Sequence, residues 1–128
     1  TPRRNSGVKY IRKGDFLMEK TVMIGGAEYK MKSTAANLLK YKAQFGRDLL
    51  TDVQKMQSAH LADGSWDFSK IDLETVYEMV WLLIKAANPE LPPPMEWLDT
   101  LDSFPLKDAA GEAMILYVES MEGTAKNG

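Results

Sequence analysis

The chain has 128 residues, with 18 acidic and 16 basic side chains and a formal net charge of −2. Its apolar content of 45% and charged content of 27% are ordinary for a globular protein of one domain. Cysteine is absent, which excludes disulfides, zinc–thiolate sites and thiol nucleophiles. No apolar run reaches the roughly 18 residues that span a bilayer, so we expect no membrane partner.

The charge is distributed unevenly along the chain. Residues 1–17 carry five basic side chains and one acidic side chain, a net of +4, so the overall −2 leaves −6 for residues 18–128. Such an acidic body argues against nucleic acid as a partner, because phosphate binding needs a basic face. We expect residues 1–17 to be a disordered leader. A further hypothesis is that they are translated upstream DNA or a cloning remnant, because residues 12–18 can be encoded with a ribosome-binding site ahead of Met18.

A β-hairpin is predicted over residues 20–32. The first half is rich in β-branched residues, which favour extended backbone. Gly25–Gly26 supplies the positive φ angles of a tight two-residue turn. After the turn, Tyr29 and Met31 alternate with charged residues, which predicts one apolar face and one solvent-exposed face.

Two helices are predicted after the hairpin. Ser33 or Thr34 is expected to cap the first, and Gly46 can adopt the left-handed conformation that ends it. Asp48 can then cap the second helix; a single bent helix through Gly46 is the alternative. The residues expected to face inward are Ala35, Leu38, Leu39, Tyr41 and Phe45 in the first helix and Leu49, Leu50, Val53 and Met56 in the second.

A loop over residues 62–68 precedes the helix that we expect to be central to the core. Ser69 and Asp72 resemble a capping box, which predicts a helix over residues 71–87 that ends before Pro89. Apolar residues cover most of its circumference, as in helices buried at the centre of a domain. They are Leu73, Val76, Tyr77, Val80, Trp81, Leu83 and Ile84.

Two more helices are predicted near the C-terminus. Proline suits a first helical turn, so a short helix is expected over residues 94–101. The last is expected over residues 106–121, ended by Gly123, with residues 124–128 as a frayed tail. Its inward stripe would consist of Leu106, Ala110, Ala113, Met114, Tyr117 and Met121. The predicted fold is therefore α+β and mostly α: an N-terminal β-hairpin followed by a bundle of about five helices, forming one domain over residues 18–123.

No set of residues in the sequence forms a recognisable catalytic or metal site. His60 is the single histidine and is expected at an exposed helix end, because a base or ligand needs partners. The pairs Asp48/Asp52 and Asp99/Asp102 are too few for an oxygen cage of about six ligands. We therefore expect no enzyme, no metal and no cofactor.

Charged and aromatic residues near turns are the candidates for binding another protein. We interpret Arg47 as paired with an acidic group inside the fold; an acidic group on a partner is the alternative. Trp66, Phe68, Trp97 and Phe104 are aromatic residues in or beside loops. By default they close the ends of the core, although aromatic and methionine side chains are also enriched in protein interfaces.

Two segments carry a resemblance to a known family: YKAQFGRDLL over residues 41–50 and EWLDTLDSF over residues 96–104. They resemble the tail assembly chaperones of long-tailed, siphovirus-type bacteriophages and prophages. In that family a Tyr and then Phe-Gly-Arg-Asp close an early helix, and a Trp-Leu segment follows a Pro-rich loop. The resemblance covers residues 18–122, except that residues 54–69 match nothing. The matching positions are Tyr41, Phe45, Gly46, Arg47, Asp48, Trp81, Trp97 and Leu98.

The resemblance implies a protein that performs no catalysis and binds the long, apolar tape-measure protein. It further implies recruitment of tail-tube subunits, action in the cytoplasm of the bacterial host and absence from the mature virion. The partner-binding or fold-signature residues would be Tyr41, Phe45, Arg47, Asp48, Trp97, Leu98 and Phe104. Family members also tend to form homo-oligomers.

A longer, frameshifted form of the chain is a further expectation from the resemblance. Many family members are made in two lengths by a ribosomal slip near the end of the gene. Residues 125–127 can be encoded with a heptamer that favours such a slip, so we expect this chain to be the short form. The alternative reading of the whole sequence is a structural tail or head–tail connector protein that stays in the virion.

Overall fold

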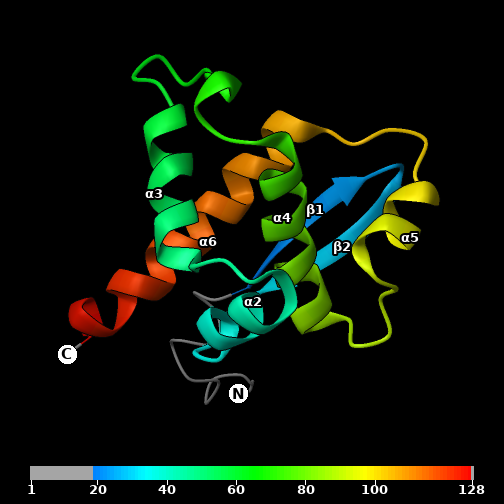
Figure 1. Cartoon of the computed structure of the whole chain (residues 1–128), viewed down its shortest axis with the longest axis horizontal. Helices are drawn as coiled ribbons and strands as arrows, with labels where there is room; N and C mark the ends of the chain where they lie inside the picture. The colour runs from blue at the N-terminus through cyan, green and yellow to red at the C-terminus, as the bar shows by residue number, and fades with distance from the viewer. Residues whose placement is uncertain (1–18, 128) are drawn as a thin grey trace, which may run out of the picture.

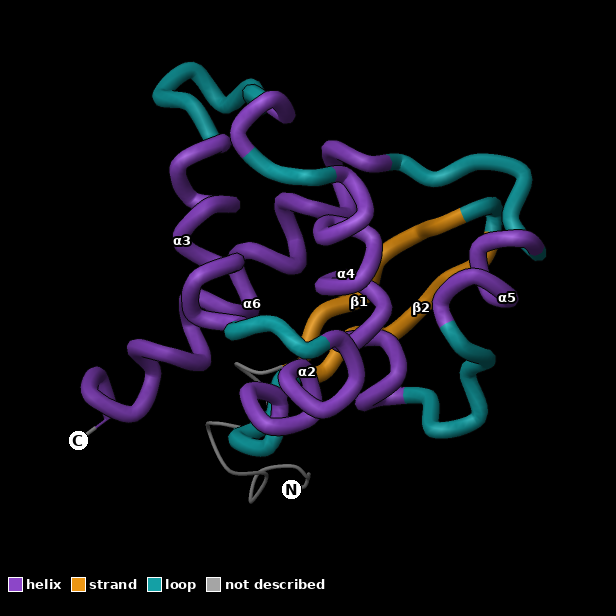
Figure 2. The backbone as a smooth tube through the Cα atoms, viewed as in Figure 1, coloured by secondary structure: helices purple, strands orange, loops and turns teal. Residues whose placement is uncertain are grey.

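The computed structural model describes residues 19–127 (Figure 1). It confirms the predicted α+β, mostly α class: within the described residues, a two-stranded hairpin is followed by five α-helices and one 3₁₀ helix (Figure 2). The hairpin lies behind α4 in this view, with α3 and α5 on opposite sides of the molecule. The expected leader, residues 1–17, lies outside the described residues.

The hairpin forms as predicted. Strand β1 (Glu19–Ile24) pairs antiparallel with β2 (Ala27–Lys32), and Ile24 lies opposite Ala27. This register leaves Gly25 and Gly26 as a two-residue turn, with φ angles of 59° and 80°. One face of the hairpin is buried against α4 and α6, which cover β2 and β1 respectively. The buried hairpin residues are Val22, Ile24 and Met31.

The next segment forms two helices rather than one bent helix. Helix α2 (Asn37–Phe45) ends at Gly46, whose φ of 73° is left-handed and whose N–H donates to the Lys42 carbonyl at 2.8 Å. Helix α3 (Leu49–Ala59) begins at Asp48, whose carboxylate accepts hydrogen bonds from Leu50 N–H and the Thr51 hydroxyl, both at 3.2 Å. Both predicted boundaries are therefore confirmed.

The predicted cap at the start of α2 is wrong. The N-cap position is Ala36, which has no capping side chain. The hydroxyls of Ser33 and Thr34 instead bond to the side chain of Asn37, at 3.4 and 3.2 Å. Because these hydroxyls are occupied by a buried amide, the helix starts three residues later than Thr34 and carries no side-chain cap.

Helix α4 (Leu73–Ala87) is the central helix of the core, as expected. It is capped at its C-terminal end by Asn88, whose side-chain amide donates to the Ile84 carbonyl at 2.8 Å and to the Lys30 carbonyl of β2 at 3.2 Å. The latter bond ties the end of α4 to the hairpin. The buried residues of α4 are Thr75, Val76, Met79, Val80, Trp81, Leu82, Leu83 and Ile84.

The capping box predicted before α4 does not form. Ser69 lies in the short 3₁₀ helix η1 (Phe68–Lys70), where its N–H and hydroxyl both donate to Asp67, at 3.1 and 2.5 Å. Asp72 is at the N-cap position of α4 but accepts no capping hydrogen bond. The nearer Asp67 holds Ser69 in a local turn, so no reciprocal pair with Asp72 is made.

Helices α5 (Pro94–Asp99) and α6 (Leu106–Asn127) complete the fold. The prediction that Gly123 ends the last helix is wrong, because α6 continues to Asn127. That residues 124–128 form a frayed tail stays a prediction. A glycine inside a helix is unfavourable by only about 1 kcal/mol relative to alanine, so it does not force an end. On its inner side α6 presents alanines, and the Tyr117 hydroxyl donates to the Met79 carbonyl of α4 at 2.7 Å.

Candidate protein-binding site

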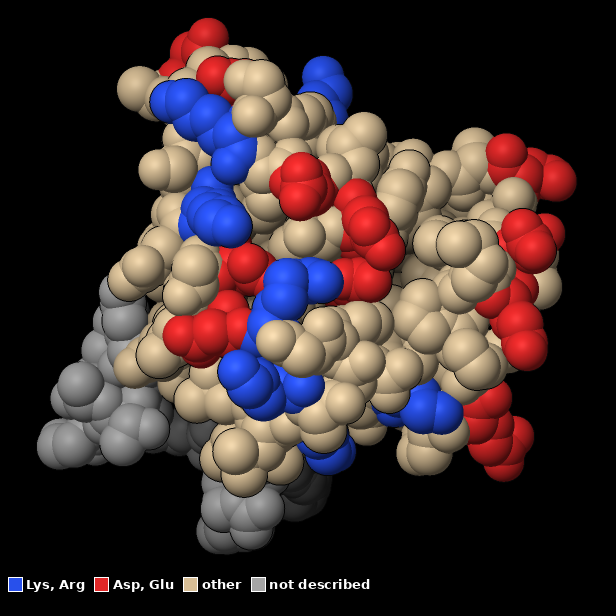
Figure 3. All heavy atoms as spheres, in the orientation of Figure 1, with Lys and Arg blue, Asp and Glu red and all other residues tan. Residues whose placement is uncertain are grey.

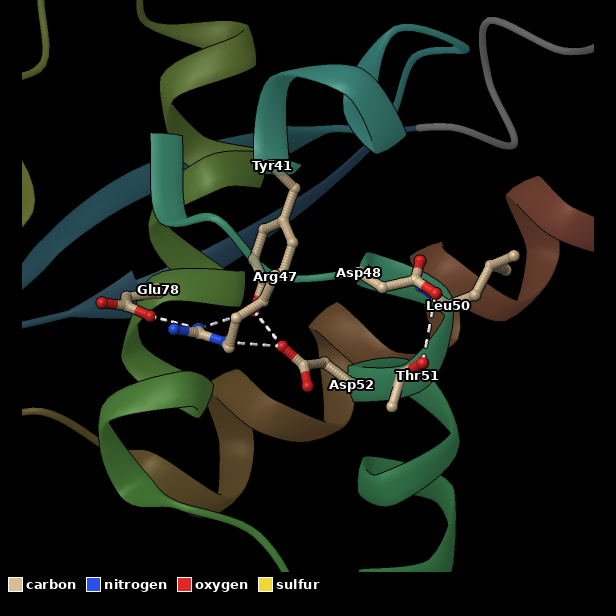
Figure 4. A network of polar contacts seen from close by, with 7 residues as sticks. All are labelled: Tyr41, Arg47, Asp48, Leu50, Thr51, Asp52 and Glu78. Carbon is tan, nitrogen blue, oxygen red and sulfur yellow. Dashed lines mark hydrogen bonds and ion pairs between the residues drawn. The ribbon is translucent and has the colours of Figure 1, made fainter. Parts of the chain in front are cut away.

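Four polar side chains form a cluster where α2, α3 and α4 meet (Figure 4). The Nε of Arg47 donates to Asp52 Oδ2 at 2.9 Å, and its Nη2 donates to the Tyr41 hydroxyl at 2.9 Å and to the Glu78 carboxylate. Tyr41 in turn donates to Asp52 Oδ2 at 2.7 Å. The prediction that Arg47 pairs inside the fold is confirmed, because both of its acidic partners belong to this chain.

Local backbone geometry brings these groups together. The left-handed Gly46 reverses the chain after α2, and Asp48 starts α3 two residues later. Arg47 lies between them, so its side chain reaches α4 as well as the first turns of α3. Its guanidinium lies 5.5 and 5.7 Å from the ring centres of Tyr41 and Phe45, within the range of cation–π contacts.

Burial and pairing fix the charge states in this cluster. Asp52 is 3% exposed, and its carboxylate is held by Arg47 and Tyr41. Burial, reinforced by the hydrogen bond to Asp52, raises the pKa of Tyr41 well above its usual range. Burial opposes the charge of Arg47, but its hydrogen bonds to Glu78 and Asp52 outweigh this and raise its pKa. The cluster therefore holds a neutral phenol and a cation at all physiological pH values.

The cluster links α2, α3 and α4 through contacts inside the fold. Its guanidinium is already engaged by two carboxylates and a phenol, so this cation is not free to face a partner. Asp48 is exposed and caps α3. Of the predicted site residues in this segment, Tyr41, Phe45 and Arg47 thus hold helices together, and Asp48 starts one.

The other predicted site residues lie in α5 and in the segment that follows it, and α5 and α3 lie on opposite sides of the molecule (Figure 1). Trp97 is 2% exposed and packs edge-on against Tyr29 and Phe104, with ring centres 5.6 and 6.2 Å apart. Phe104 also packs edge-on against Tyr77 at 4.8 Å. Leu98 and Phe104 line a shallow hollow of about 260 Å³. The sequence therefore identified two separate packing clusters, not one site.

The proline-rich connector before α5 is held by polar contacts from α4. The indole N–H of Trp81 donates to the Pro92 carbonyl at 2.8 Å. The ammonium of Lys85 donates to the carbonyls of Pro89 and Leu91, at 2.6 and 2.8 Å. These bonds fix the position from which α5 packs Trp97 onto the hairpin. The indole N–H of Trp97 itself has no hydrogen-bond acceptor among the described residues.

An exposed apolar face lies along α3 and α6, where the sequence predicted buried residues. Leu38, Leu50 and Met121 were expected to face inward but are 42%, 45% and 38% exposed. They line one hollow of about 420 Å³ together with Leu49 and Tyr117. A separate hollow of about 390 Å³ lies between the end of α3 and α6. Its apolar lining residues are Met114, Ile115 and Val118.

Two of these exposed leucines belong to adjacent leucine pairs. Leu38–Leu39 and Leu49–Leu50 are adjacent pairs, and adjacent residues in a helix point about 100° apart. A helix that buries one stripe does not have to bury both members of such a pair. Leu49 is 2% exposed and Leu50 is 45% exposed. In α2 both leucines are exposed, because Tyr41 and Asn37 take the inner positions.

The titratable groups form no additional site in the described part of the chain. His60 is exposed at the end of α3, and its ring centre lies 4.7 Å from that of Trp66. Asp99 and Asp102 are exposed, and acidic side chains gather at the edge that α5 forms (Figure 3). Within residues 19–127 no three His, Cys, Asp or Glu side chains are grouped to hold a metal ion. None of the helices in this range is long and apolar enough to cross a bilayer.

Comparisons with known proteins found no relative of this chain. The chain matches no protein-family model, no curated protein and no solved structure.

Proposed function

We propose that this chain is a tail assembly chaperone of a long-tailed bacteriophage or prophage. In this role it binds the tape-measure protein and recruits tail-tube subunits in the cytoplasm of the bacterial host. It performs no catalysis and leaves before the virion is complete. A longer frameshifted form and homo-oligomers belong to the same proposal, which rests on the two segments that resemble the family and on one structural observation.

That observation is the exposed apolar hollow where residues 33–38 meet α3 and α6. Leu38, Leu50 and Met121 are 42%, 45% and 38% exposed and line one hollow together with the buried Leu49 and Tyr117. Contiguous exposed apolar surface marks a site that binds another polypeptide. A tape-measure helix has apolar stripes that stay exposed until the tail tube surrounds it. A chaperone that covers those stripes by side-chain contact needs no nucleotide, since the tube protein can displace it.

Co-expression tests the proposal. Under this proposal a very long tape-measure gene lies downstream of this one, and its product is expected to be insoluble alone. We expect soluble recovery when this chain is co-expressed, and a complex that survives gel filtration. Equal solubility with and without this chain would contradict the proposal.

Mass spectrometry of purified virions separates a chaperone from a structural tail or connector protein. We expect peptides from the tube and tape-measure proteins and none from this chain. Its presence in stoichiometric amounts would favour the structural alternative.

A further inference from the structure

The loop between α3 and η1 contains an Asp–Gly pair in a tight turn. Asp63 and Gly64 are both exposed, and Gly64 has a left-handed φ of 89°. Two backbone hydrogen bonds close the turn: Gly64 N–H donates to the Leu61 carbonyl at 2.9 Å, and Leu61 N–H donates to the Ser65 carbonyl at 2.8 Å. The pair is therefore accessible to water while its backbone is held by the turn.

An Asp–Gly pair can rearrange without an enzyme. The amide nitrogen of the glycine attacks the carboxyl carbon Cγ of the aspartate and forms a C–N bond, while the amide proton and the carboxyl OH leave as water. The product is a five-membered succinimide. Water then opens this ring at either carbonyl, which restores aspartate or gives isoaspartate, whose main chain runs through Cβ and Cγ. Glycine favours the reaction, because its lack of a Cβ leaves the backbone free to reach the required geometry.

Three features of the closed turn oppose this reaction at Asp63. The attacking amide, that of Gly64, is engaged by the Leu61 carbonyl. The carboxylate is held by Ser65, whose hydroxyl and N–H donate to Asp63 Oδ1 at 2.6 and 2.9 Å. These two bonds lower the pKa of Asp63, so the carboxyl stays ionised, whereas the protonated carboxyl is the form that loses water readily. The closed turn therefore protects the pair.

This protection depends on hydrogen bonds that compete with water. Every residue from Leu61 to Ser65 is exposed, and the net contribution of a hydrogen bond in such a setting is small. Exposed loops also open locally at a lower free energy than the core. Opening of this turn releases the Gly64 amide and the Asp63 carboxyl together, so both reacting groups become free in the same event.

We propose that Asp63–Gly64 is a site of spontaneous isoaspartate formation, which the hydrogen bonds from Ser65 slow while the turn is closed. The reaction lengthens the main chain by one carbon between α3 and η1. The hydrogen bond from Leu61 N–H to the Ser65 carbonyl spans this point and cannot keep its geometry afterwards. A chain that has reacted therefore carries an altered loop.

Peptide mapping of an aged sample tests the proposal. The purified full chain is incubated at physiological pH in heavy-oxygen water, digested and analysed by mass spectrometry. Each ring opening inserts one solvent oxygen, so label reports passage through the succinimide whichever product forms. Asp102, which is exposed and followed by Ser103, is an internal reference. We expect label to accumulate at Asp63 faster than at Asp102.

The next turn of the chain supplies a matched control. Asp67 is held by the N–H and hydroxyl of Ser69 in the same way, at 3.1 and 2.5 Å, but Phe68 follows it instead of glycine. We expect Ser65→Ala to speed labelling of Asp63 about fivefold, the factor that corresponds to one lost hydrogen bond. Ser65→Thr, which keeps a hydroxyl, and Ser69→Ala are expected to leave the labelling of Asp63 unchanged.

The outcomes that overturn the inference are distinct. Label at Asp63 that does not exceed the label at Asp67 and Asp102, in both the wild type and Ser65→Ala, would show that the pair does not react. Equal labelling of Asp63 in the wild type and Ser65→Ala would show that Ser65 does not restrain the reaction. An equal rise at Asp63 in Ser69→Ala would assign the restraint to the whole loop rather than to Ser65.

Discussion

Arg47 is the side chain on which α2, α3 and α4 converge. Through it, Asp52 of α3 and Glu78 of α4 are tied to Tyr41 of α2. Loss of Arg47 would leave the Asp52 carboxylate without its cation, and Asp52 is only 3% exposed. A buried carboxylate without its cation is strongly unfavourable, whereas an exposed ion pair contributes little.

Replacing Arg47 with alanine is expected to destabilise the fold by about 2–3 kcal/mol. The usual loss for a broken buried pair is about 3–5 kcal/mol, and solvent reduces it here because the Arg47 side chain is 36% exposed. Urea unfolding followed by circular dichroism measures the change. Lys55→Ala, an exposed basic residue on α3, is the matched control and is expected to change stability by less than about 0.5 kcal/mol. Equal effects of the two substitutions would contradict the structural role of Arg47.

Tyr117 makes stability sensitive to high pH. Its burial raises its pKa well above the ordinary value of about 10. Below pH 10 the phenol is neutral in both states, so its contribution is constant. Above pH 10 the unfolded chain releases the proton and the folded chain retains it, so stability falls as pH rises, by up to about 1.4 kcal/mol per pH unit for this group.

The Tyr117→Phe variant removes the titrating group. We expect its unfolding free energy to fall less steeply than that of the wild type between about pH 10 and pH 12, as measured by urea unfolding at fixed pH steps. Part of the wild-type slope will remain, because burial also raises the pKa of Tyr41. Identical slopes for the two proteins would show that Tyr117 does not keep its proton in the fold.

At the scale of elements, the sequence predicts boundaries best where one residue determines the backbone. Gly25 and Gly26 turn the hairpin, and Gly46 with Asp48 separates α2 from α3, as predicted. The predicted caps fail where several polar groups compete nearby. The hydroxyls of Ser33 and Thr34 bond to Asn37, and Ser69 is held by Asp67. Sequence spacing alone does not decide such competitions.

Two glycines in different environments provide a test at this scale. Gly46→Ala is expected to destabilise the fold by about 1–2 kcal/mol, because a left-handed φ of 73° is unfavourable for a residue with a Cβ. Gly111→Ala is expected to stabilise it by about 0.5–1 kcal/mol, because this position is helical and has open space for a Cβ. Thermal unfolding of both variants measures the difference. Changes of the same sign would contradict the assigned backbone conformations.

At the scale of the whole molecule, fold class was predictable and the exposed face was not. Alternation and helical periodicity report which side of each element is apolar, and this was sufficient for an α+β fold with a central α4. Whether an apolar side chain is covered depends on which helix packs beside it. Leu50 and Met121 follow the helical pattern of buried residues, yet both line an open hollow. Distant packing, rather than local pattern, creates the candidate site.

The aromatic and charged motifs illustrate the same limit. Tyr41, Arg47 and Trp97 are conspicuous in sequence, and the structure uses all three for internal contacts. A residue pattern that defines a fold does not also mark where its partner binds. The candidate surface is made instead of ordinary leucine, isoleucine and methionine side chains, whose role emerges only from their exposure.

Hydrogen–deuterium exchange of the purified chain, alone and in complex with the co-expressed tape-measure protein, tests the central claim most directly. We expect slower exchange on binding for amides in α3 and in α6, where Leu50 and Met121 are exposed, and little change in α5. Absence of any complex, or protection confined to α5 and the hairpin, would contradict the claim that this face holds the partner.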